Sequence, residues 1–177
     1  MMSNLSERTP RQLFFTTGED LYFLTYNLVI VLSILGASAE KPLKDCNSLA
    51  VLVTLIADSQ LLDLIERYKT PIKKASRDYH LLLSAASRAR RKRPYLARLH
   101  HALARRGIVE IAGNPARYTI GLLPGASIRD FTEDAIFEQE RANMKRLCKL
   151  IPRIKVMTAE TLQRHVFQTR GVVAWPH

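Results

Sequence analysis

The sequence predicts a mainly α-helical chain that carries one small β-hairpin. Leucines recur at helical spacing between residues 94 and 106, which places them on one face of a helix. Two runs of β-prone residues, 108–111 and 118–122, flank a Gly-Asn-Pro sequence that is typical of a turn. Further stretches with helical spacing precede and follow this part of the chain, so we expect flanking helices around it.

The chain begins with a predicted flexible arm over 1–17, followed by an apolar helical region over 18–70. A first helix, capped by Thr17 or Asp20, is expected to run to about Leu35. Because it is apolar on most sides, it should be buried in the fold or against another chain. The apolar stretch is too short and too often interrupted by polar residues to span a membrane comfortably, so we predict no membrane partner.

The second half of the apolar region should contain two consecutive helices or one bent helix. Asp45 or Asn47 is the candidate cap, and the apolar pattern continues to about Tyr68 with an interruption at 58–59. A polar and basic linker over 69–77, which contains a proline, is the best candidate for a domain boundary.

A winged helix-turn-helix element with a basic block is predicted over 78–124. Asp78 is a candidate cap for a helix that runs into an Arg/Lys cluster, and a second amphipathic helix is expected to begin at Pro94. Gly107 should end that helix, because glycine tolerates the left-handed cap conformation and the preceding arginines suit the negative helix end. A helix, a glycine and a hairpin in this order form the closing half of a winged helix.

The remaining segment, 126–177, is predicted to form C-terminal helices and a tail. Ser127 or Asp130 is the candidate start of a helical region that a proline at position 152 ends. Thr158 should begin a shorter amphipathic helix that ends by Gly171.

The positive charge of the chain is concentrated in one block. The formal net charge of the 177 residues is +11. Between Arg67 and Arg106 there are thirteen Lys and Arg residues and one acid, Asp78, so this block carries +12 and the rest of the chain about −1. Clustered charge of this kind indicates a polyanionic partner. A solvated basic surface that only aids solubility is the alternative interpretation.

Double-stranded DNA is the polyanion that a winged helix can bind, with one helix in the major groove and the wing on phosphates. Arg98, His101 and Arg105 should point away from the leucine face of the second helix. Few Asn, Gln or Ser residues lie on that helix, so we expect backbone contact with weak base reading. An acidic protein surface is the other possible partner. The candidate nucleic-acid-binding residues are Arg88, Arg90, Arg91, Lys92, Arg93, Arg98, His101, Arg105, Arg106, Asn114 and Arg117.

The sequence contains no recognisable catalytic pattern. It has no glycine-rich phosphate loop, no nucleophile elbow and no metalloprotease helix. The adjacent His100 and His101 point in different directions on a helix and cannot chelate one metal ion, so we expect a solvated or groove-facing pair. Cys46 and Cys148 have no paired motif and are expected to be small buried thiols in a reduced cytoplasm. We therefore predict no catalytic residue, metal or cofactor, and no enzymatic activity.

Three stretches of the chain carry a resemblance to a known family. They are 21–32 with its continuation at 43–58, the passage 99–109 into the hairpin, and the end at 160–175. Together they resemble the middle components of bacterial three-component ABC-type defence systems of the Lamassu kind. The resemblance implies a cytoplasmic, non-enzymatic accessory subunit that joins an SMC/Rad50-like ATPase to an effector, often a nuclease, in defence against phage or plasmids. A stand-alone winged-helix transcription regulator is the alternative function.

Overall fold

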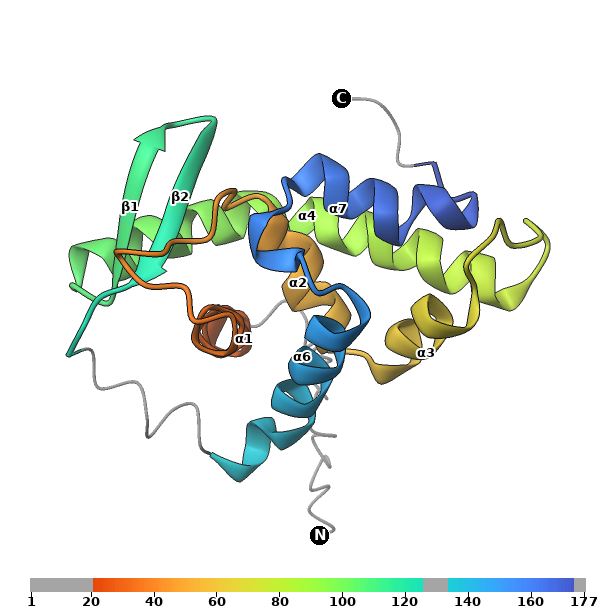
Figure 1. The fold of residues 1–177 in the computed structure, drawn as a ribbon, viewed down its shortest axis with the longest axis horizontal. Helices are drawn as coiled ribbons and strands as arrows, with labels where there is room; N and C mark the ends of the chain where they lie inside the picture. The colour runs from red at the N-terminus through yellow and green to blue at the C-terminus, as the bar shows by residue number, and fades with distance from the viewer. Residues whose placement is uncertain (1–20, 126–133, 174–177) are drawn as a thin grey trace, which may run out of the picture.

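A computed structural model of the chain describes residues 21–125 and 134–173. The elements, shown in Figure 1, are α1 (Leu21–Ile34), α2 (Ser48–Ile56), α3 (Ser59–Arg67), α4 (Arg77–Arg105), β1 (Val109–Asn114), β2 (Arg117–Leu122), η1 (Ala135–Phe137), α6 (Glu138–Leu150), η2 (Ile154–Val156), α7 (Ala159–Val166) and η3 (Gln168–Arg170). The structure confirms a mainly helical chain with a small β-hairpin. Predictions that lie outside the described residues concern the arm at 1–17, the caps Thr17 and Asp20, and the helix starts Ser127 and Asp130.

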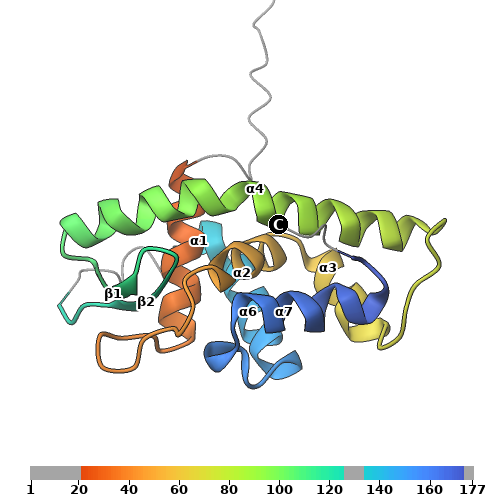
Figure 2. The same cartoon turned by 90° about the horizontal axis from the view of Figure 1, so that it is seen from above.

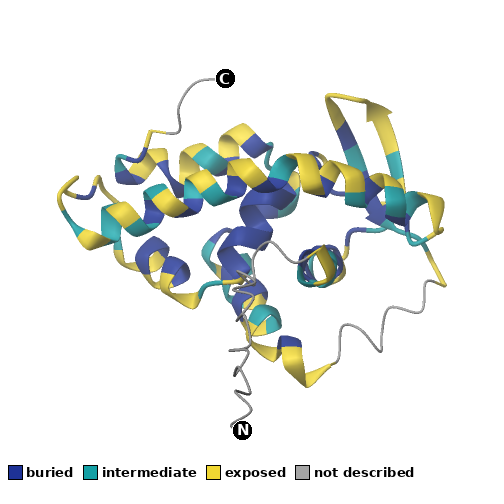
Figure 3. Ribbon diagram, turned by 180° about the vertical axis from the view of Figure 1, so that it is seen from behind, coloured by how far each residue is buried: buried dark blue, intermediate teal, exposed yellow. Residues whose placement is uncertain are grey.

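Helix α2 is the centre of the structure. All nine of its residues are buried, and α1, α3, α4, α6 and α7 all contact it. The view coloured by burial shows α2 dark blue along its length, in contrast to the alternating colours of α4 (Figure 3). A helix that is apolar all round is expected at such a place, because every side of it meets another element.

Helix α1 confirms the first predicted helix, with seven of its residues buried, among them Leu28 and Leu32. It contacts α2, α4, α6 and β2, so its broad apolar surface is covered mainly from within the chain. Leu21 and Tyr22, at its N-terminal end, are exposed. No single helix among the described residues is long and apolar enough to cross a membrane; α2 and α3 pass that test only together, with a bend of 104° between them.

The bend between α2 and α3 settles the predicted alternative in favour of two helices. Asp58 adopts an extended conformation and its carboxylate accepts a hydrogen bond from the Gln60 amide (3.1 Å), which caps α3. At the start of α2 the flanking residue is Asn47, which makes no side-chain cap. Instead Asp45 accepts a hydrogen bond from the amide of Asn47 (3.0 Å).

A single helix, α4, replaces the two helices predicted on either side of Pro94. Its cap is Ser76, whose hydroxyl accepts from the Tyr79 amide (3.2 Å), and the predicted cap Asp78 lies in the first turn. Pro94 removes one N–H from the helical ladder. The inward face is nevertheless buried on both sides of it, at Ala89 and at Leu96, and this packing holds 29 residues in one helix.

The predicted hairpin is confirmed. Strands β1 and β2 pair antiparallel, with Val109 opposite Leu122 and Asn114 opposite Arg117. The Asn114 side chain accepts hydrogen bonds from the amides of Ala116 (3.1 Å) and Arg117 (2.8 Å), which stabilises the turn. Gly107, between α4 and β1, has a φ of +69° as expected for a helix-ending glycine.

The connection between α1 and α2 runs along the other edge of β2. Leu43 and Ile120 exchange two backbone hydrogen bonds (2.9 and 3.2 Å), and Ser38 forms a bridge with Leu122. At Gly121 the backbones approach so closely that a Cβ atom would lie 2.2 Å from the Ser38 carbonyl oxygen. The hairpin is therefore fixed to the helical body along one strand edge.

The C-terminal helices pack against the first three helices. Helix α6 contacts α1, α2 and α3, and the Arg146 guanidinium bonds to the carboxylates of Asp63 (2.7 Å) and Glu66. Thr158 caps α7 as predicted, accepting from the Thr161 amide (3.2 Å).

One hydrophobic cluster of buried residues joins all these elements. It includes side chains from α1, α2, α3, α4, both strands, α6 and α7. The linker over 69–77 contributes the buried Ile72, whose amide donates to the Arg170 carbonyl (3.0 Å). Figure 2 shows α4 along one edge of the molecule, with the hairpin, α2, α3 and α7 on the same side of it.

Candidate nucleic-acid interface

The cluster Arg88–Arg93 lies in the middle of α4 and not in a loop before a recognition helix. Successive residues of an α-helix point about 100° apart, so the five cations of the cluster spread around the helix. Arg88 is half-buried, and its Nη2 lies 3.5 Å from a carboxylate oxygen of Asp58 at the start of α3. Lys92 is buried, with 9% of its surface exposed. The structure therefore does not bring the predicted cluster together on one surface.

The outward face of α4 carries a second set of arginines. Arg91, Arg98 and Arg105 are exposed and lie seven residues apart, so they follow each other along one side of the helix at intervals of about 10 Å. Among the described residues none of the three has an ion pair or a side-chain hydrogen bond. We call these three residues the outward stripe. His101, on a neighbouring face, and Arg106, just after the helix, are also exposed.

A cleft of about 840 Å³ lies between α4, the turn before α2, the hairpin turn and α7. Arg90 and Arg93 line it from α4, and Arg117 lines it from β2. The two arginines from α4 lie three residues apart and so project on one side of that helix. The structure thus places Arg91, Arg98 and Arg105 on the outward stripe and Arg90, Arg93 and Arg117 in this cleft, whereas Arg88 and Lys92 lie in neither.

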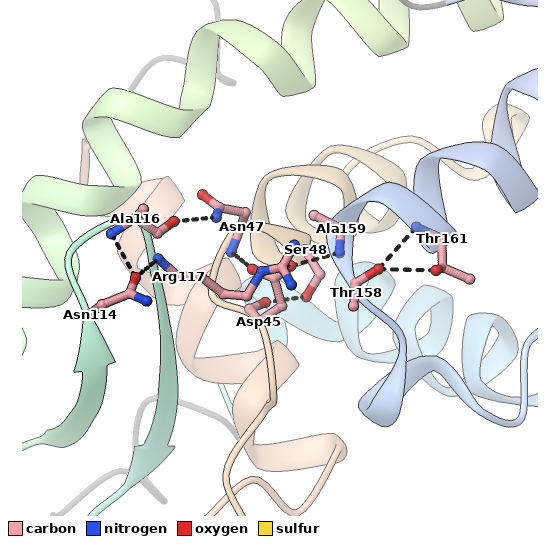
Figure 4. Close-up of polar contacts among 9 residues, drawn as sticks. All are labelled: Asp45, Asn47, Ser48, Asn114, Ala116, Arg117, Thr158, Ala159 and Thr161. Atoms are coloured by element: carbon pink, nitrogen blue, oxygen red, sulfur yellow. Dashed lines mark hydrogen bonds and ion pairs between the residues drawn. The ribbon is translucent and has the colours of Figure 1, made fainter. Parts of the chain in front are cut away.

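The Asp45 carboxylate ties together the elements that form the cleft. It is 1% exposed. One oxygen accepts from the Asn47 amide (3.0 Å), and the other accepts from the Ala159 amide at the start of α7 (2.9 Å). The second oxygen also lies 3.6 Å from Nε of Arg117. Figure 4 shows these contacts, with the hairpin turn on one side of Asp45 and α7 on the other.

The two predicted wing residues form contacts within the chain. Asn114 accepts the two turn amides, and Arg117 is paired with Asp45, although 57% of its side chain is exposed. The hairpin turn is further held by the Asn47 side-chain amide, which donates to the Ala116 carbonyl (3.1 Å) (Figure 4). This end of the hairpin is therefore held to the segment at the start of α2, although residues 112–117 are themselves exposed.

His100 is buried, so the expectation of two solvated histidines holds for His101 alone. Nδ1 of His100 lies 2.8 Å from the Tyr118 hydroxyl, and 2% of the residue is exposed. Burial, with a smaller contribution from the nearby His101, lowers the pKa of His100 to about 4. The signal for this was present in the sequence, because His100 continues the helical spacing of Leu96 and Leu103.

The thiol of Cys46 lies near this pair. Burial raises the pKa of Cys46 and of Tyr118 above their ordinary values. Cys46 is free and buried, as expected, and Cys148 is free and half-buried. The Cys46 thiol and the Tyr118 hydroxyl are therefore neutral at pH 7. Together with His100 they lie at the contact between α4, β2 and the start of α2.

Arg170 is a buried cation that the sequence did not single out. It is 2% exposed. Its guanidinium donates to the carbonyls of His165 (2.8 Å) and Val166 (2.9 Å) in α7 and of Ile65 (2.6 Å) in α3. The negative ends of two helices thus surround this charge, while burial lowers the pKa of the guanidinium.

In the part of the chain that the structure describes, no group of three or more His, Cys, Asp or Glu side chains could hold a metal ion. Comparison of the sequence with protein-family models finds no match. Comparisons with curated proteins and with solved structures find no match either. Support for the candidate interface therefore comes from its geometry and charge alone.

Proposed function

We propose that the chain is a non-enzymatic accessory subunit of an SMC-like ATPase complex that defends bacteria against phage or plasmids. In this role it scaffolds the ATPase and an effector subunit, and it contacts double-stranded DNA through α4. The observation that carries the DNA contact is the outward stripe of unpaired arginines. Membership in the complex rests on the resemblance of three stretches of the sequence to subunits of such systems.

The geometry of the outward stripe suits the phosphate backbone of a duplex. Arg91, Arg98 and Arg105 extend over about 20 Å of one helix face, and no acidic residue lies on α4 beyond Asp78. Arginine forks bind phosphate through two parallel hydrogen bonds. Such contacts fix affinity and orientation but do not read sequence, so the proposed binding has little base preference.

The order of elements supports a winged-helix interpretation of the fold. Helix α1 is followed by a segment paired with β2, then by α2, and later by α4, β1 and β2. In such an arrangement the helix before the hairpin is the one that approaches the DNA, and here that helix is α4. Because the hairpin turn is held to the start of α2, the proposed interface consists of the helix and not of the wing.

The decisive test of DNA contact compares two variants with the same change in net charge. Arg91→Glu, Arg98→Glu and Arg105→Glu alter the outward stripe. Lys41→Glu, Lys145→Glu and Lys149→Glu alter exposed lysines elsewhere. Fluorescence anisotropy on a 25-base-pair duplex between 50 and 200 mM KCl should show that the stripe variant binds on the order of 100-fold more weakly and that its log–log salt dependence is shallower by about three units.

The lysine variant should keep its affinity within about threefold, because its substitutions lie away from the proposed contact. Equal losses in both variants would show that only overall charge matters and would refute the proposed interface. A native pull-down with mass spectrometry tests the complex itself. A large coiled-coil ATPase in the eluate supports the accessory subunit, whereas a homodimer that binds one palindromic sequence alone supports the transcription regulator.

A further inference from the structure

The cleft beside α4 has more positive charge than its own contacts neutralise. Arg117 is paired with Asp45, and Glu160 is paired with Arg164 (3.0 Å). Arg90 and Arg93 have no ion pair or side-chain hydrogen bond within the described residues. Two like charges three residues apart on a helix repel each other, so a bound anion would stabilise this pair.

The guanidinium of Arg93 is accessible only in part. Its Nε atom is inaccessible to solvent and has no hydrogen-bond partner in the structure. A buried donor without an acceptor costs about 1–3 kcal/mol, and such groups are rare enough to need a functional or structural explanation. An anion cannot reach an atom that solvent cannot reach, so a ligand in the cleft would bind the accessible Nη atoms of Arg93 together with Arg90.

The other residues that line the cleft indicate which chemical groups the rest of the ligand should carry. Leu83 and Ala86 on α4 and the exposed Val173 provide an apolar surface, and Gln163 and Gln168 provide amide groups. Neither glutamine side chain makes a hydrogen bond within the described residues. The volume of about 840 Å³ falls in the range of small-molecule sites, which combine apolar walls with a few polar groups.

We propose that this cleft binds a small phosphorylated ligand with an uncharged heterocyclic body, which is the chemistry of a nucleoside monophosphate. A phosphate monoester carries a charge between −1.5 and −2 at pH 7, which matches the two uncompensated arginines of α4. Because Asp45 pairs with Arg117 and Glu160 pairs with Arg164, the uncompensated charge of the cleft is limited to Arg90 and Arg93, which is too little for a long polyanion. The site is thus separate from the outward stripe and does not depend on the DNA contact.

Isothermal titration calorimetry on the full chain tests the ligand class. The titrants are the four ribonucleoside 5′-monophosphates, their unphosphorylated nucleosides and inorganic phosphate. We expect saturable binding of at least one monophosphate, binding of inorganic phosphate at least tenfold weaker, and no binding of the nucleosides. Absence of saturation for every monophosphate up to 5 mM, or equal affinity for inorganic phosphate, would overturn the proposal.

Variants assign the binding to the cleft. Arg90→Gln with Arg93→Gln should weaken monophosphate binding by about 100-fold, since each charge-assisted contact contributes roughly a factor of ten. The matched control, Lys145→Gln with Lys149→Gln, removes the same charge from exposed positions of α6 and should change affinity by less than twofold. Circular dichroism checks that each variant folds.

A third variant leaves α4 intact. Gln163→Glu places a negative charge on the α7 side of the cleft and should weaken binding at least fivefold through repulsion of the phosphate. Unchanged affinity in both cleft variants would overturn the proposal. Binding of an octaglutamate peptide with the same dependence on Arg90 and Arg93, without binding of any monophosphate, would also overturn it and assign the cleft to an acidic peptide.

Discussion

At the scale of single residues, buried polar groups hold the parts of the molecule that surround the candidate sites. Asp45 connects α2, α7 and β2, and His100 connects α4 to β2 through Tyr118. A buried polar group is tolerated when its hydrogen bonds are formed, and becomes costly when it must change its charge. Because the pKa of His100 is lowered in the folded chain, this cost can be measured as a change in stability with pH.

We predict that stability falls in acid through His100. The pKa of His100 is lowered to about 4 in the folded chain, whereas an unfolded histidine titrates near 6.5. Between these values the unfolded state binds more protons, so the free energy of unfolding is highest above pH 6.5 and decreases as the pH falls towards 4. The full loss is about 3 kcal/mol, from the difference between the two pKa values.

Urea denaturation between pH 4 and 8, followed by circular dichroism, measures this slope. His100→Gln should have a flatter profile over the same range, because it removes the titrating ring. His80→Gln, at an exposed position, is the control and should keep the wild-type profile. A wild-type profile that is already flat between pH 4 and 6.5 would contradict the assignment.

At the scale of elements, local signals predicted most of the structure and long-range contacts explain the differences. Gly107 and the Gly-Asn-Pro turn act through backbone geometry, so the sequence located the end of α4 and the hairpin correctly. The prediction that a second helix begins at Pro94 is wrong, because a proline disfavours a helix interior without excluding it and the buried faces on either side keep α4 continuous.

The candidate site could be predicted only in part. The exposure of Arg98, His101 and Arg105 follows from helical spacing and was correct. The division of the basic cluster between a stripe, a cleft and buried positions depends on α4 being one helix. The contact of Asp45 with α7 joins residues 114 positions apart, and no periodicity of a single sequence predicts which distant segments meet.

The contact that Arg170 forms between α3 and α7 gives a prediction at the scale of elements. Arg170→Met keeps the length of the side chain but leaves the carbonyls of Ile65, His165 and Val166 without their donor. We expect a loss of about 3 kcal/mol in the free energy of unfolding. Arg170→Lys should lose less stability, because the lysine ammonium keeps the positive charge although it lacks the planar guanidinium group.

Thermal and urea unfolding of both variants measure these losses. The control is Arg164→Met, since Arg164 is 61% exposed and forms only a surface ion pair. A loss below 1 kcal/mol for Arg170→Met would show that water satisfies the three carbonyls in its place.

At the scale of the whole molecule, the core extends across the predicted boundary at 69–77. Side chains on both sides of this linker belong to the same buried cluster. Helix α2, which precedes the linker, contacts α4, α6 and α7, which follow it. A shared core of this kind couples the stability of the segments that contribute to it. The basic surface of α4 lies outside this core and can therefore change in charge with little effect on folding.

We predict a single cooperative unfolding transition for the full chain. Differential scanning calorimetry should give a calorimetric enthalpy equal to the van't Hoff enthalpy, which is the signature of two-state unfolding. A fragment of residues 78–177 should show no transition, because it lacks α2 and the contacts around it. Two separate transitions, or cooperative unfolding of the fragment, would instead support a domain boundary at the linker.

Because Asp45 binds the start of α7, the cleft can form only after that helix has been synthesised. Ala159 follows the last residue of α4 by 54 positions, which corresponds to about 3–11 s at translation rates of 5–20 residues per second. Throughout that interval the arginines of α4 have emerged, but the wall formed by α7 has not. The proposed DNA-binding surface of α4 is thus synthesised before the cleft can close, and the cleft is completed only with α7.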